Sequence, residues 1–123
     1  MKKNTTFLTF FIVLIFMLTN CSNDGDDLTQ IELGIWISLD KKDTLNFETK
    51  NDFYKSNGYM QNDHYDYKLL SKDSIQIGYR GKLFIAVEPT NHTYSIEQDK
   101  LTIDFTNKSC YGFEDNIITY MKQ

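Results

Sequence analysis

The chain has 123 residues and a formal net charge of −4, which suits one domain with a modest core and excludes two independent cores. Residues 1–20 hold two lysines and no acidic side chain, so the remaining 103 residues carry a formal charge of −6 and a single arginine, Arg80. This balance excludes a nucleic-acid binder, because neutralising phosphates requires clustered Lys and Arg. The chain has one alanine, and after residue 20 it is rich in Tyr, Phe, Ile and Thr, which favours strands over helices.

The first twenty residues predict a signal-peptide helix. Lys2 and Lys3 precede a run from Phe7 to Leu18 that is apolar except for Thr9. These twelve residues fall short of the roughly 20 that a helix needs to cross a bilayer, and they match the apolar region of a signal peptide.

The segment Leu18-Thr19-Asn20-Cys21 resembles the lipobox of bacterial lipoproteins. The resemblance implies cleavage before Cys21 and attachment of acyl chains such as palmitate to that cysteine. Two or three acyl chains anchor a protein stably to a membrane, whereas one does not. The alternatives are an ordinary secretory signal with a chance cysteine and an uncleaved membrane anchor.

Residues 21–30 are predicted to form an acidic, flexible tether. The segment Ser22-Asn-Asp-Gly-Asp-Asp27 is polar and low in side-chain bulk, so it cannot join a core. It also looks like the acidic export signals of lipoproteins that are carried to the outer face of an outer membrane, with a plain linker as the alternative. The expected location is therefore the cell envelope, lipid-anchored to the outer membrane, with surface exposure if the export signal acts.

From residue 31 onward the pattern predicts antiparallel hairpins. Apolar and polar residues alternate with period two in several short runs, which is typical of half-buried strands. Three segments repeat an aromatic residue, a polar turn with an aspartate, and two apolar residues two apart; they predict hairpins over 36–47, 67–77 and 94–105. The turn aspartates Asp43, Asp73 and Asp99 suit tight turns, because Asp bonds its own backbone and tolerates left-handed dihedrals.

Further strands are expected at 52–56, pairing back on 44–48, at 82–87, ended by Pro89, and at 117–121. Any helix in this region should be short, with 56–62 as the best candidate for a loop or single turn. Eight or nine strands in a meander leave two exposed edges unless the sheet closes, which favours a small barrel over a two-sheet sandwich.

Gly34-Ile-Trp36 looks like the Gly-x-Trp motif of lipocalin-like proteins. Residues 31–123 are similar to small lipocalin-like domains of bacterial lipoproteins through Leu45-Asn-Phe47, Phe53-Tyr54, Tyr65-x-Tyr67 and Asp99-x-Leu101-x-Ile103. The resemblance implies an all-β, up-and-down barrel with the tryptophan packed across one end, and in some members a small hydrophobic ligand inside.

A ligand pocket inside such a barrel would be lined by aromatic side chains, with an arginine at the mouth to anchor a carboxylate. The alternative is that the aromatic residues are simply core. The candidates are Trp36, Tyr65, Tyr67, Tyr79, Tyr94 and Arg80.

Three other motifs bear on modification, metal binding and nucleophilic chemistry. Asp43-Thr44-Leu45 and Asp73-Ser74-Ile75 match the O-glycosylation pattern of some bacterial envelope proteins at Thr44 and Ser74, and the same residues are ordinary turn-to-strand chemistry. Asp63-His64-x-Asp66 offers too few ligands for a metal site, so no metal or cofactor is expected. Cys110 is expected to be a small buried hydrophobe rather than a nucleophile.

The sequence therefore predicts a non-enzymatic, membrane-anchored lipoprotein whose lipocalin-like domain binds a small hydrophobic ligand or has a filled interior. The alternative is an envelope interaction protein, such as an inhibitor or immunity factor, that binds a protein partner through its loops at 57–64 and 106–116. Its acidic surface would suit a basic target.

Overall fold

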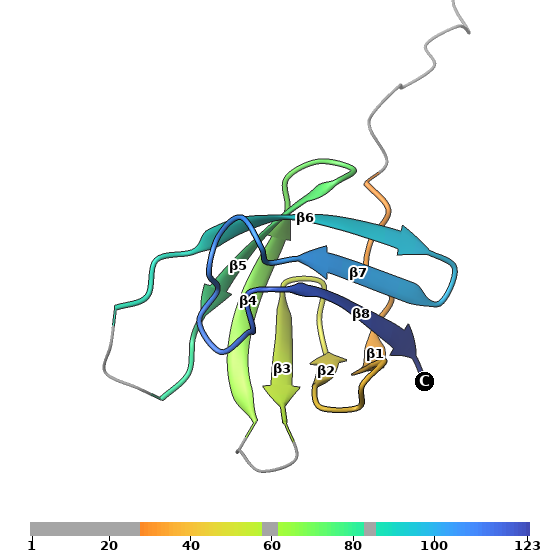
Figure 1. Ribbon diagram of the computed structural model, residues 1–123, viewed down its shortest axis with the longest axis horizontal. Helices are drawn as coiled ribbons and strands as arrows, with labels where there is room; N and C mark the ends of the chain where they lie inside the picture. The colour runs from red at the N-terminus through yellow and green to blue at the C-terminus, as the bar shows by residue number, and fades with distance from the viewer. Residues whose placement is uncertain (1–27, 58–61, 83–85) are drawn as a thin grey trace, which may run out of the picture.

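The computed structural model describes residues 28–57, 62–82 and 86–123 (Figure 1). The predicted signal-peptide helix, Cys21 and residues 22–27 of the predicted tether lie outside these ranges. The described residues form eight strands and no helix, and so include no helical segment able to cross a bilayer. The strands are β1 (Gly34–Ser38), β2 (Thr44–Phe47), β3 (Asp52–Ser56), β4 (Asp63–Leu69), β5 (Ser74–Tyr79), β6 (Thr90–Glu97), β7 (Lys100–Asp104) and β8 (Ile117–Lys122).

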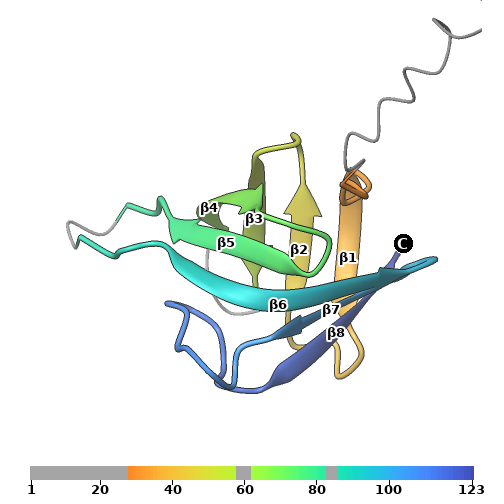
Figure 2. The same ribbon diagram turned by 90° about the horizontal axis from the view of Figure 1, so that it is seen from above.

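These strands close into one barrel. Each strand pairs antiparallel with the next, and β1 also pairs with β8 (Figure 2). In that pair Ile37 of β1 lies opposite Met121 of β8. Closure leaves no free sheet edge among the eight strands. The predicted all-β, up-and-down barrel is thus confirmed, and it is consistent with a lipocalin-like fold. The three predicted hairpins are present as β1–β2, β4–β5 and β6–β7, and β3 pairs back on β2 as expected.

Two details differ from the sequence-based expectations. Of the predicted strand at 82–87, residues 83–85 lie outside the described ranges, and Lys82, Ala86 and Val87 are in no strand. A continuous apolar run shows no period that separates a strand from a partly buried loop. The left-handed turn positions belong to Lys41 (φ 59°) and Gln98 (φ 54°) rather than to the turn aspartates. Asp43 instead directly precedes β2, and its carboxylate accepts a hydrogen bond from Lys55.

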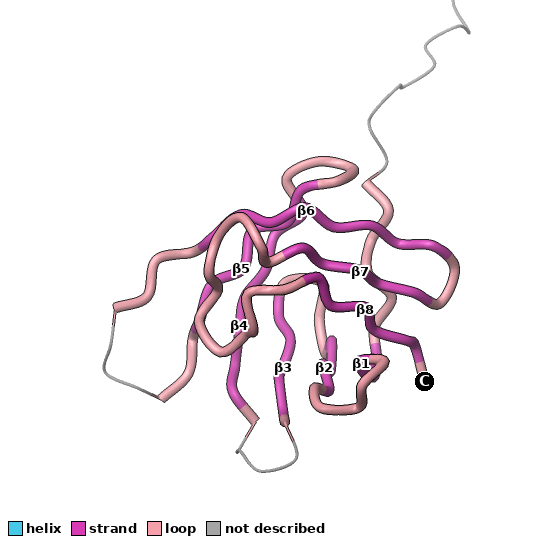
Figure 3. The backbone as a smooth tube through the Cα atoms, in the orientation of Figure 1, coloured by secondary structure: helices cyan, strands magenta, loops and turns pink. Residues whose placement is uncertain are grey.

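The barrel has two different ends. The tether end carries residues 28–33, the short turns at 48–51, 70–73 and 98–99, and the C-terminus. The loop end carries the β1–β2 turn and the longer β3–β4, β5–β6 and β7–β8 connections (Figure 3). Because strands in a meander alternate in direction, connections that are two apart always fall at the same end.

The interior is filled by inward-facing side chains, as the alternating burial of each strand shows. Large aromatic and aliphatic groups occupy it, and their rings contact one another; the Phe53 and Tyr65 rings stack at 5.1 Å, for example. The buried polar or charged residues of the described chain, Ser38, Lys55 and His92, all lie toward the loop end. The core therefore carries its buried Ser, Lys and His side chains toward the loop end, among aromatic rings.

Residues 28–33 cover the tether end of the barrel. Ile31 is buried in the core cluster, and the indole Nε1 of Trp36 donates to the Glu32 carbonyl at 2.9 Å. The tryptophan thus packs at this end, as the Gly-x-Trp resemblance implies. The longer loops lie at the opposite end of the barrel.

Candidate functional site at the loop end

A cleft of about 450 Å³ opens at the loop end, between the β1–β2 turn and the β7–β8 loop. Lys55 and Asn57, at the end of β3, contribute to its lining. A hollow of about 100 Å³ shares Lys55, Asn57 and Gly112 and adds Asp63 and Tyr111. The described parts of the two predicted contact loops, 57–64 and 106–116, therefore meet at one place.

Lys55 lies at the inner wall of this cleft. Its position follows from strand parity, since Phe53 faces inward and Lys55 is two residues further along β3. Only 7% of the residue is exposed. Its Nζ donates to Asp43 Oδ1 at 2.9 Å and lies 5.1 Å from the centre of the Phe113 ring. The ammonium group thus ties together β3, the β1–β2 turn and the β7–β8 loop.

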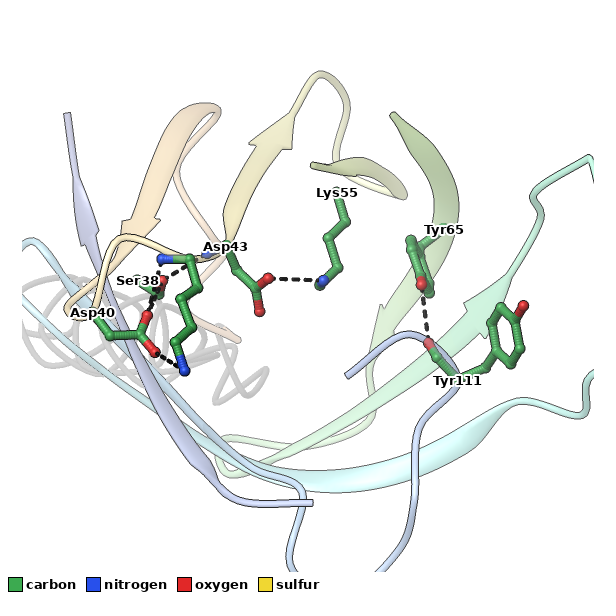
Figure 4. A network of polar contacts seen from close by, with 7 residues as sticks. Ser38, Asp40, Asp43, Lys55, Tyr65 and Tyr111 are labelled. Carbon is green, nitrogen blue, oxygen red and sulfur yellow. Dashed lines mark hydrogen bonds and ion pairs between the residues drawn. The ribbon is translucent and has the colours of Figure 1, made fainter. Parts of the chain in front are cut away.

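The β1–β2 turn is held by hydrogen bonds around Ser38 (Figure 4). The buried Ser38 hydroxyl donates to Asp40 Oδ1 at 2.7 Å and accepts from the Asp43 backbone N–H at 2.9 Å. The Lys42 N–H also donates to Asp40 Oδ1, at 3.1 Å. These bonds, that from the Ser38 hydroxyl first, hold the pKa of Asp40 below its usual value. The turn therefore presents an ionised carboxylate to the cleft.

The β7–β8 loop forms the other wall and is held against the barrel. The Tyr65 hydroxyl, from β4, donates to the Tyr111 carbonyl at 2.9 Å. Gly112 follows with φ 81°, and a side chain there would collide with the Tyr65 hydroxyl. The Phe113 ring then stacks on Phe105 at 4.6 Å. The loop is therefore fixed by the core beneath it.

Three further polar side chains lie toward this end of the core. His92 contacts Thr90 Oγ1 through Nε2 at 2.7 Å, and burial lowers its pKa. Burial raises the pKa of the Cys110 thiol to about 11, so the thiol stays protonated at neutral pH. The Tyr120 hydroxyl and the His92 Nδ1 are buried without a hydrogen-bond partner among the described residues.

The five aromatic residues of the predicted pocket all lie in the core cluster: Trp36, Tyr65, Tyr67, Tyr79 and Tyr94. Arg80 does not join them. Its side chain is 59% exposed on the outer surface, and its Nε donates to Asp66 Oδ2 at 2.7 Å. The structure therefore brings the aromatic candidates together as interior packing and places the arginine apart from them.

The other candidate residues lie on the walls of the barrel. Thr44 and Ser74 are the half-buried first residues of β2 and β5, at opposite ends. His64 stacks on Tyr54 and lies 3.7 Å from Asp52. Within the ranges that the structure describes, no three His, Cys, Asp or Glu side chains are grouped as metal ligands.

Sequence reasoning identified the loops at 57–64 and 106–116 but missed the residues of the β1–β2 turn and of the strand ends that complete the cleft. Leu39 and Ile117 line it and are 64% and 58% exposed, and the Leu39 N–H donates to the Thr119 carbonyl at 3.0 Å. Strand parity could have placed Lys55 inside the barrel. Its pairing with Asp43 and the meeting of the β1–β2 turn with β8 follow only from closure of the barrel.

Comparison with protein-family models, with curated proteins and with solved structures found no match for this chain.

Proposed function

We propose that this protein is a non-enzymatic lipoprotein of the cell envelope, held to the outer membrane by acyl chains on Cys21, whose barrel recognises a protein partner through its loop end. The lipobox-like segment and the acidic residues after it support the anchor and the location. The described chain enters the barrel at the tether end, so an anchor there would hold the loop end away from the membrane.

The observation that carries the recognition step is a filled interior beneath an open cleft. Eleven large interior side chains are less than 2% exposed, and an internal ligand would have to displace some of them. The cleft outside the core needs no such displacement. Its rim holds two large exposed aliphatic side chains, Leu39 and Ile117, beside charged groups. Exposed apolar groups rimmed by polar residues are typical of protein-binding surfaces.

A small hydrophobic ligand inside the barrel is the second candidate, and the aromatic character of the core favours it. Native mass spectrometry of the full chain, extracted in mild detergent, separates the two. Recognition through the loop end predicts the protein mass with its acyl groups and no further small molecule. A retained apolar molecule of constant mass would support the internal-ligand function instead.

The partner is tested by placing a photo-crosslinking amino acid at Leu39 in the full-length protein in cells. The matched control carries the same amino acid at Leu70, an exposed leucine at the tether end. The proposal predicts a discrete protein adduct at Leu39 that is absent at Leu70. Identical adducts at both positions, or none at Leu39, would argue against recognition through the loop end.

A further inference from the structure

Resting on the proposed function, we propose that the loop-end cleft takes a basic side chain of the partner protein, with Glu114 as its counter-charge and with Leu39 and Ile117 contacting apolar residues beside it. The charges, the exposed aliphatic groups and the ring packing at the cleft support this proposal.

The charges of the cleft leave one carboxylate uncompensated. Three carboxylates and two ammonium groups line it. Lys55 is paired with Asp43 at 2.9 Å, and Lys42 lies 3.8 Å from Asp40. The exposed carboxylate of Glu114 has no polar partner in the described part of the chain. A cation is therefore the group that would complete the charge balance.

A competing cation can also displace the Lys42 ammonium group from Asp40. Its two side chains are 67% and 55% exposed, and exposed pairs of this kind contribute little. Asp40 keeps its hydrogen bonds from Ser38 and the Lys42 backbone when the Lys42 side chain moves away. A second carboxylate at the same cleft thus becomes available without loss of the turn.

The rim favours a protein over a sugar as the source of the cation. Leu39 and Ile117 offer aliphatic surface. A sugar stacks on an aromatic face, but Phe113, the aromatic residue of the cleft lining, is already in contact with the Phe105 ring and the Lys55 ammonium. The exposed Tyr111 ring borders the neighbouring smaller hollow instead. Peptides supply a basic group flanked by apolar side chains, which is the combination that this rim fits.

The wall that carries Glu114 is held in place before any partner binds. The Asn116 N–H donates to the Glu114 carbonyl at 2.8 Å, and the Phe113 N–H donates to the Cys110 carbonyl at 3.0 Å. Preorganisation of this kind reduces the entropy lost on binding.

The test is a calorimetric titration of the full-length protein in detergent with the peptide acetyl-Leu-Arg-Leu-amide. We expect saturable binding that weakens about five-fold or more when Arg is replaced by the neutral isostere citrulline, or when Glu114→Gln is introduced. Leu39→Ser and Ile117→Ser should weaken binding as well. The matched controls Glu97→Gln and Leu70→Ser, both exposed at the tether end, should leave it unchanged.

A charge reversal makes the test sharper. Glu114→Lys should shift the preference to acetyl-Leu-Glu-Leu-amide. Equal binding of the arginine and citrulline peptides, no effect of Glu114→Gln, or binding of the cationic sugar glucosamine but not of the arginine peptide would overturn the inference. A discrete crosslink at Leu39 without arginine-dependent binding would refute this inference alone and leave the proposed function standing.

Discussion

At the scale of single residues, Lys55 shows how the fold accommodates a charge in its interior. The ammonium group lies inside the barrel because strand parity puts it there, and it is stabilised by the Asp43 carboxylate and the Phe113 ring. Removing one member of such a pair leaves the other charge without its partner in a poorly solvated place. The contribution of the pair to the free energy of unfolding is therefore given by the coupling energy of a double-mutant cycle, and not by either single substitution.

We predict that Lys55→Met destabilises the protein by about 3 kcal/mol, at the lower end of the range for a broken buried pair, because Asp43 borders the cleft. The double variant Lys55→Met with Asp43→Asn should lose less stability than the sum of the two single variants. Urea unfolding of the four proteins measures this. Strictly additive losses would mean that the two side chains do not interact.

His92 is predicted to make stability depend on pH near neutrality. Burial lowers its pKa below the ordinary histidine value of 6.5, so the folded protein resists protonation that the unfolded chain accepts. The unfolded state then binds more protons, and stability falls as the pH drops through about 6.5 toward the lower folded pKa. Asp40 and Asp104, whose pKa values are also lowered, titrate below this window.

The measurement compares the unfolding free energy of the wild type and of His92→Asn at pH 7.5 and pH 5.0. The wild type should lose more stability over this interval than the variant, in which every other titrating group is retained. A loss of equal size in both proteins would show that His92 does not contribute.

At the scale of elements, the β7–β8 loop depends on one glycine and one tyrosine from another strand. Gly112 has φ 81°, and its missing side chain leaves room for the Tyr65 hydroxyl to reach the Tyr111 carbonyl. β4 therefore positions a loop that lies more than forty residues further along the chain.

We predict that Gly112→Ala destabilises the protein by about 1–3 kcal/mol, because it combines backbone strain with a collision at the hydroxyl. Tyr65→Phe should cost about 1 kcal/mol for the lost hydrogen bond. Combining the two should cost less than their sum, since the collision disappears with the hydroxyl. If Gly112→Ala leaves the melting temperature unchanged, the loop is not held as described.

For the molecule as a whole, the fold was largely predictable, whereas only part of the site was, namely the loops at 57–64 and 106–116. Alternation in segments such as 74–79 and the polar turns between them give strands and hairpins directly, and the need to cover sheet edges gives closure. The cleft joins the β1–β2 turn to a loop about seventy residues later, and only the pairing of β1 with β8 brings them together. Local pattern holds no information on such a distant contact.

The aromatic candidates also show what a local sequence pattern cannot predict. Period-two spacing placed Tyr65 and Tyr67 on one inward face, but whether that face lines a pocket or packs solid depends on all eight strands at once. Arg80 follows an inward residue, Tyr79, so parity alone would have put its side chain outside the barrel, where it pairs with Asp66.

Attachment of the barrel to a membrane through acylated Cys21 is tested by metabolic labelling with a palmitate analogue, followed by separation of membrane and soluble fractions. The chain has two cysteines, so Cys110→Ser serves as the matched control for Cys21→Ser. We predict that the wild type and Cys110→Ser carry the label and sediment with membranes, whereas Cys21→Ser carries none and is soluble. Label retained by Cys21→Ser, or absent from the wild type, would contradict the account.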